Sequence, residues 1–306
     1  MHEEIYSEGE FTLDPYMVKA LNQDDVDQFQ NLFISISNVN SRLSPIHIYD
    51  PLLRSRPPIL SVCIYAGARN IVHFLLMNGA DIQLYDSKGR LPLHFAACSG
   101  NTDLVVDLLQ FGCDMNSTDF YQRNVLHYAA EFGCYETVIL MFTYGFDLTS
   151  RHYRGWTPLH FSAWNNSIGI AKFLLENGTD PEVESTNNET PLQFALYNKF
   201  NRFAKLLLKY GAKPEGRPET HHAKPLIWCV KSDNVEGIQL LMKYKINLEI
   251  TNEFNETALE VALRSNRLKA AEYLIDHGAK ITNNAKESTM MSPAARNLVK
   301  SKLRSH

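Results

Sequence analysis

The sequence predicts an all-α fold in which antiparallel helix pairs stack into a solenoid, and three observations predict it. First, a ten-residue motif recurs, and the second residue of each copy stands at positions 59, 92, 125, 158, 191, 225 and 258. Second, a glycine follows twenty residues after each of these positions, except in the sixth copy, which has Lys245. Third, the apolar residues between the two markers follow helical spacing.

The copy at residues 157–166, TPLHFSAWNN, shows what each part of the motif does. Thr157 is suited to cap the first helix, and Pro158 fits its first turn, where no amide donor is missed. The stretch IAKFLLENG at 170–178 predicts a second amphipathic helix, and Gly178 suits a left-handed residue at its end. Since one such pair cannot bury its apolar face alone, neighbouring pairs must supply the rest of the core.

These motifs resemble the ankyrin repeat, and the resemblance covers nearly all of residues 14–281. It implies that hairpin-like loops join the helix pairs and project to one side. It also implies a curved stack whose loops and first helices form a concave binding surface. We therefore expect an elongated particle.

The two ends of the array depart from the repeat pattern. We expect an N-terminal capping repeat at 1–35, because ALNQDDVDQFQNLF at 20–33 fits a helix pair but lacks the TPLH signature. An extended loop is expected at 36–58, because the stretch from 34 to 58 carries four prolines, which interrupt helices. Seven repeats should occupy 59–281. A C-terminal capping helix and tail should follow at 282–306, where SPAARNLVKSKLRSH predicts a basic amphipathic helix.

Composition narrows the class of protein. The formal net charge of −4 lacks the basic field expected of a nucleic-acid binder. Five cysteines without a CxxC pair indicate free thiols in a reducing compartment, so we expect a cytoplasmic or nuclear location. The N-terminus has no secretory pattern, and the apolar runs are too short to span a membrane. A monomer without membrane insertion is expected.

The histidines of the motif are interpreted as architectural. His94, His127 and His160 share one repeat position, which is a poor arrangement for a catalytic pair. The resemblance implies that the motif imidazole bonds the loop backbone and the motif threonine. His221 and His222 are interpreted as part of a solvated loop. Because no phosphate loop, nucleophile elbow or metal-ligand set occurs, we expect no enzyme activity, no cofactor and no metal.

The resemblance places partner contacts at the loop tips and at the exposed ends of the first helices. In the second full repeat these positions hold Tyr85, Lys88, Arg90 and Cys98. Aromatic residues and arginines, which are typical of interface hot spots, concentrate at the centre of the array. The predicted partner-binding residues are Tyr121, Arg123, Phe132, Tyr153, Arg154, Trp156, Trp164 and Tyr197. The alternative is that residues such as Trp156 and Phe132 only pack against adjacent loops.

The sequence therefore favours a non-catalytic scaffold or adaptor that binds a protein partner on the concave surface. Two alternatives remain open. One is a nucleic-acid-associated protein that uses arginine and aromatic residues, although the acidic balance disfavours a nucleic-acid partner. The other is a substrate-recognition subunit of a larger enzyme complex.

Overall fold

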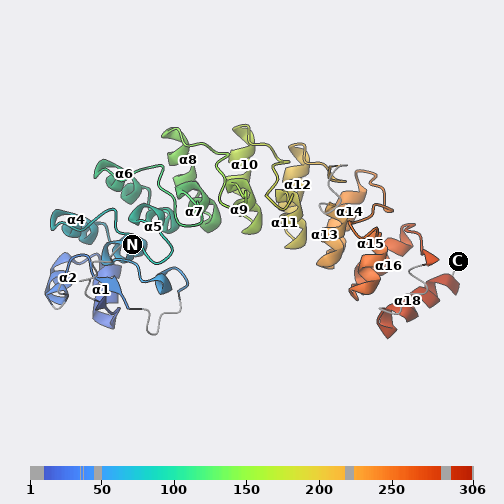
Figure 1. The fold of residues 1–306 in the computed structure, drawn as a ribbon, viewed down its shortest axis with the longest axis horizontal. Helices are drawn as coiled ribbons and strands as arrows, with labels where there is room; N and C mark the ends of the chain where they lie inside the picture. The colour runs from blue at the N-terminus through green and yellow to red at the C-terminus, as the bar shows by residue number, and fades with distance from the viewer. Residues whose placement is uncertain are drawn as a thin grey trace, which may run out of the picture. The chain divides into compact units, whose positions relative to one another are not determined.

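The computed structural model describes residues 10–34, 36, 38–44, 50–217, 224–283 and 291–304. Nearly all regular structure within these ranges is helical (Figure 1), which confirms the all-α repeat fold. The chain divides into two compact units, which we call unit 1 (Met1–Tyr153) and unit 2 (Arg154–His306).

Unit 1 is a stack of helix pairs. The pairs are α1 (Pro15–Gln23) with α2 (Val26–Phe33), α3 (Ile59–Ala66) with α4 (Arg69–Met77), α5 (Pro92–Ser99) with α6 (Thr102–Gln110), and α7 (Val125–Phe132) with α8 (Tyr135–Thr143). The first helices pack on one another in chain order, α3 on α5 and α5 on α7. This layer of first helices carries the loops and side chains of the predicted binding surface.

The segment between α2 and α3 holds short regular elements. Strand β1 (Glu10–Phe11) pairs in parallel with β2 (Arg42–Leu43), and the 3₁₀ turn η1 (Leu53–Ser55) precedes α3. The described residues of this segment form β2 and η1 and contain no α-helix, and the extended loop expected at 36–58 stays a prediction. Its turn η1 packs against the next repeat, where Leu52 and Ser55 accept hydrogen bonds from Arg90.

Unit 2 repeats the same arrangement. Its pairs are α9 (Pro158–Trp164) with α10 (Ile168–Glu176), α11 (Pro191–Tyr197) with α12 (Asn201–Lys209), α13 (Pro225–Lys231) with α14 (Val235–Met242), and α15 (Ala258–Arg264) with α16 (Leu268–Asp276). The first helices again pack in order, α9 on α11, α11 on α13, and α13 on α15. Helix α18 (Pro293–Arg304) packs on α16 and covers the end of the stack (Figure 1).

The repeat markers have the structural roles that their chemistry suggests. Each motif anchor is the first residue of a first helix, as Pro158 is in α9 after its N-cap Thr157. The glycines twenty residues later adopt positive φ, for example 85° at Gly178. Lys245, which replaces glycine in the sixth repeat, adopts the same left-handed region with φ 55°. The turn geometry is therefore kept even where a side chain makes it less favourable.

Candidate functional site

The loops before α5, α7, α11 and α15 are each shaped by a polar side chain that accepts backbone amides. Asp119 Oδ1 lies 2.8 Å from the backbone nitrogens of both Tyr121 and Arg123. Asn252 holds the equivalent loop of unit 2 in the same way. These bonds fix the loop backbone, so the side chains at the loop tips are presented from a rigid support.

Three of the predicted contact residues are exposed in unit 1. Tyr121 and Tyr153 lie on successive loops, with ring centroids 5.6 Å apart and a backbone bond from Tyr153 N to Tyr121 O of 3.1 Å. Phe132 is the last residue of α7 and is also exposed. The two tyrosines form one aromatic patch on the loop side of unit 1.

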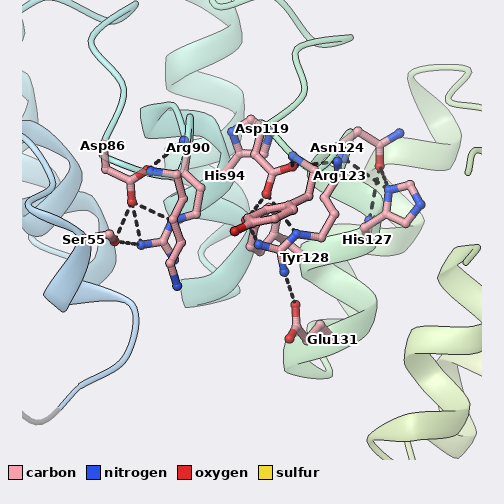
Figure 2. A network of polar contacts seen from close by, with 12 residues as sticks. Ser55, Asp86, Arg90, His94, Asp119, Arg123, Asn124, His127, Tyr128 and Glu131 are labelled. Carbon is pink, nitrogen blue, oxygen red and sulfur yellow. Dashed lines mark hydrogen bonds and ion pairs between the residues drawn. The ribbon is translucent and has the colours of Figure 1, made fainter. Parts of the chain in front are cut away.

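Arg123 lies beneath this patch and is engaged in a polar network (Figure 2). Its Nε lies 2.9 Å from Asp119 Oδ2, and its Nη1 lies 3.1 Å from Glu131 Oε2. The hydroxyl of Tyr128 accepts from Nη2 and donates to Asp119 Oδ2. The side chain of Arg123 is only 17% exposed. Its guanidinium therefore supports the loop, and its part in partner contact stays a prediction.

Burial changes the acid–base properties of the same network. It raises the pKa of the Glu131 carboxyl above its ordinary value, although the neighbouring Arg123 acts in the opposite direction. Burial also raises the pKa of Tyr128, so its phenol remains protonated at neutral pH. A protonated Tyr128 can donate to Asp119, as the observed bond requires.

Arg90 corrects one sequence-based expectation. We expected it among the exposed contact positions, but the residue is only 2% exposed. Its Nε donates to Asp86 Oδ2 at 2.7 Å, and its Nη2 donates to the Ser55 hydroxyl (Figure 2). The same Nη2 also donates to the carbonyl of Leu52. The physical reason is that the turn before α3 covers this position and supplies the acceptors. Arg90 is a buried structural residue.

The strongest concentration of aromatic side chains lies in unit 2. Trp156 precedes α9, and its ring centroid lies 4.5 Å from that of Phe194 and 5.7 Å from that of Trp164. Trp164 is the last residue of α9 and is 44% exposed. Arg154 is exposed in the preceding loop, where its carbonyl accepts from the backbone and hydroxyl of Thr186.

The cluster continues across two more first helices. Phe194 and Tyr197 lie on α11, and Trp228 lies on α13; the centroid of Trp228 is 6.0 Å from that of Phe194 and 5.6 Å from that of Tyr197. Tyr197 is 41% exposed, whereas Phe194 is buried. We call the connected rings the aromatic strip. Its members are Trp156, Phe161, Trp164, Phe194, Tyr197 and Trp228.

Sequence reasoning missed three members of the aromatic strip. Phe161, Phe194 and Trp228 occupy one repeat position on α9, α11 and α13, separated by 33 and 34 residues. That equivalence was the available signal, because side chains at one repeat position stack in register. These inner rings hold the exposed rings in place.

One cation lies at the end of the aromatic strip. Lys231 Nζ is 5.3 Å from the ring centroid of Trp228. Within the described ranges of the chain, Lys231 makes no ion pair. Arg264, at the equivalent position of the next repeat, instead makes two bonds of 2.7 and 2.9 Å to the carboxylate of Glu256. The strip therefore has a cation at its α13 end that is available for a carboxylate.

The buried histidine and thiol of the motif have structural surroundings. His160 is fully buried; its Nδ1 lies 3.1 Å from Thr157 N and its Nε2 lies 3.0 Å from Glu189 O, as expected for a loop-locking residue. Burial raises the pKa of Cys98 well above its ordinary value, so its thiol stays in the unreactive protonated form. His221 and His222 lie outside the described residues.

The described part of the chain shows neither a metal-binding group nor a membrane-spanning helix. Its His, Cys, Asp and Glu side chains form no group of three that could hold a metal ion. Its helices are too short or too polar to cross a lipid bilayer.

Comparison with known proteins identifies the family of the chain through its repeats. A family model described as ankyrin repeats, in three copies, matches residues 60–152, 145–218 and 216–285. These matches together cover most of the chain. A comparison with curated proteins gave no match.

Proposed function

Because the chain belongs to the ankyrin-repeat family, we propose that it is a non-catalytic scaffold or adaptor that binds a partner protein through the aromatic strip of unit 2. Ankyrin repeats are generally protein–protein interaction modules and are typically non-catalytic. The family supports the class of function, and the strip supports the choice of surface. Trp156, Trp164, Tyr197 and the neighbouring Arg154 are its proposed contact residues in this unit.

The observation that carries this proposal is that Trp164 and Tyr197 are 44% and 41% exposed although each ring packs on an inner aromatic ring. Phe194 contacts Trp164 at 5.6 Å between centroids, and Trp228 contacts Tyr197 at 5.6 Å. Rings held in this way lose little conformational entropy on binding. Large rigid aromatic side chains are the residues that dominate interface energetics.

The charge distribution disfavours a nucleic acid as the partner. Unit 2, which carries the aromatic strip, contains 21 Lys and Arg against 16 Asp and Glu, so the charges next to the strip decide the question rather than the charge of the whole unit. In unit 2, Glu189 and Glu256 occupy the loop position that Trp156 occupies before α9, so carboxylates flank the aromatic strip. A polyanion needs several cations along its path, whereas Lys231 and Arg154 are the two cations that we assign to this surface. A protein ligand fits this mixture of charges better.

We also propose that the protein acts in the cytoplasm or nucleus and is a monomer when isolated. All five cysteines are free and each is buried or partly buried. Burial raises the pKa of Cys63 and Cys229, which keeps these thiols protonated inside the fold. Such packing suits a compartment in which thiols remain reduced.

The proposed function is tested by affinity purification from the native source, with bound proteins quantified by mass spectrometry. The bait variants are the wild type and Trp164→Ala with Tyr197→Ala. The matched control is Tyr244→Ala, because Tyr244 is 46% exposed but lies in the turn after α14, away from the strip. We expect a protein that is retained by the wild type and the control but lost from the double variant. Equal recovery on all three baits contradicts the proposal.

A further inference from the structure

The exposed ends of three successive first helices form an ordered row. Trp164, Tyr197 and Lys231 are the last residues of α9, α11 and α13, and they share one repeat position. Along the stack, the row therefore presents two aromatic side chains followed by one cation. A binding segment that crosses these helices meets the three side chains in that order.

From this row, and resting on the proposed function, we infer the chemistry of the partner segment. We propose that it is a polyproline II segment with proline or another apolar residue at its first and fourth positions and an acidic residue at its seventh position. The apolar residues pack on Trp164 and Tyr197. The acidic residue forms an ion pair with Lys231.

The spacing of the helices selects the conformation of the segment. Packed helices lie about 8–10 Å apart. A polyproline II helix has three residues per turn and rises about 9 Å per turn, so every third side chain points the same way at a matching distance. In a β-strand, residues three apart point to opposite faces. A polyproline II segment can thus contact each helix end with equivalent side chains.

The side chains of the row select the residues of the segment. Proline packs well on aromatic surfaces, and polyproline II segments bind aromatic-lined grooves with little loss of entropy. Lys231 has a ring contact with Trp228 and no ion pair within the described chain, so its charge is open to a ligand carboxylate. The next row position, Arg264, is occupied by Glu256. The ion pair therefore forms at Lys231.

The test begins with a displayed library of random twelve-residue peptides selected on the full-length protein and sequenced. We expect enrichment of peptides with apolar residues three apart and an acidic residue three positions further on. A fluorescein-labelled peptide with Pro, Pro and Glu at this spacing in a Gly–Ser background then serves as the defined probe in anisotropy titrations. Replacing its glutamate by glutamine should weaken binding about fivefold, the effect of a partly exposed ion pair.

A charge exchange checks the position of the acidic residue. Lys231→Glu should weaken binding of the glutamate peptide and improve binding of the matching lysine peptide. Lys243→Glu is the matched control, because Lys243 is exposed beyond the end of α14 and outside the row, and it should bind both peptides as the wild type does. Equal affinity of wild type and Lys231→Glu for both peptides overturns the inference.

The outcomes separate this inference from the proposed function. Suppose that the wild type selects peptides without an acidic preference and that Trp164→Ala selects none. The inference about the acidic residue is then wrong, and the proposed binding surface is retained. If no peptide is selected, the inference is overturned, and the affinity purification decides the proposed function separately. If peptides are selected equally by the wild type and by Trp164→Ala, both the inference and the proposed surface are wrong. If an oligothymidylate binds the wild type and is lost in both Trp164→Ala and Lys231→Glu, the surface binds nucleic acid and the inference is overturned.

Discussion

The Nε2 atom of His160 lies 3.0 Å from the backbone carbonyl oxygen of Glu189. The other ring nitrogen, Nδ1, accepts from the backbone amide of Thr157 at 3.1 Å, so the proton of the neutral ring is on Nε2 and is donated to Glu189. One imidazole therefore caps the start of α9 and ties it to the loop before α11. His160, which lies between Trp156 and Trp164 in the sequence, therefore has a structural role.

The first prediction is that His160→Ala lowers the free energy of unfolding by about 1–3 kcal/mol, because buried hydrogen-bonding groups lose their partner. His160→Gln is the matched variant, since Gln193 accepts the amide of Thr190 at 2.8 Å at the same position of the next repeat. We expect glutamine to recover part of the loss. Urea unfolding followed by circular dichroism measures both, and full stability of the alanine variant would refute the loop-locking role.

The second prediction concerns pH. Burial lowers the pKa of His94 from 6.5 to about 4, so the folded protein holds this ring neutral where the unfolded chain binds a proton. The stability that the neutral ring of His94 contributes is therefore fully present above pH 6.5 and is lost as the pH decreases towards 4. The contribution of His94 to this loss is about 3 kcal/mol.

His94→Gln tests the assignment of this pH dependence. Its side chain can still accept the amide of Leu91, which lies 3.0 Å from Nδ1 of His94, but it cannot be protonated. We expect a flatter stability profile between pH 6.5 and 4 than in the wild type. His277→Gln, which changes an exposed histidine, should keep the wild-type profile. An unchanged slope in His94→Gln would assign the pH dependence to other groups.

The third prediction concerns the buried ion pair between Arg90 and Asp86, whose charged groups lie 2.6 Å apart. Arg90→Met removes the cation and leaves a buried carboxylate, which costs about 3–5 kcal/mol. Adding Asp86→Asn removes that charge and keeps an acceptor for the loop amides, so the double variant should be more stable than Arg90→Met alone. Chemical unfolding of both variants measures this order, and the reverse order would contradict it.

The helix pairs could be predicted from the sequence because the repeat markers are local signals. Caps and left-handed turn residues act within a few positions of the chain, and the anchors at 92, 125 and 158 begin α5, α7 and α9 as the period indicates. Lys245 shows the limit of reading residues one by one. It departs from the glycine pattern in the sequence, yet its backbone keeps the left-handed turn of the other repeats.

The surface was harder to predict because exposure depends on contacts between repeats. Arg90 was expected to be exposed, yet a turn from an earlier part of the chain covers it. The spacing of residues within one repeat does not indicate that a turn from outside the repeat will bury one of them. Conversely, the exposed ring of Trp164 was predicted, while its support by Phe194 requires the packing of α9 on α11.

The fourth prediction separates the two tryptophans that flank the motif of α9. Trp156 is partly buried and contacts Phe161, Trp164 and Phe194. Trp156→Ala should lower stability by about 3 kcal/mol, within the range for removing a large buried ring. Trp164→Ala removes a half-exposed ring and should cost only about 1 kcal/mol, the value of its aromatic contacts.

Binding should show the opposite order. Trp164→Ala should weaken binding of a selected peptide or captured partner by about 2 kcal/mol or more, because an exposed, rigid ring at a helix end is a hot-spot residue. Trp156→Ala should weaken binding less than Trp164→Ala does, because the ring of Trp156 is partly buried and offers a partner less surface. Calorimetric titration beside thermal melting compares the two variants directly. If Trp164→Ala binds as the wild type does, or if its helical signal is lost at room temperature, the exposed ring of Trp164 is not part of a binding surface.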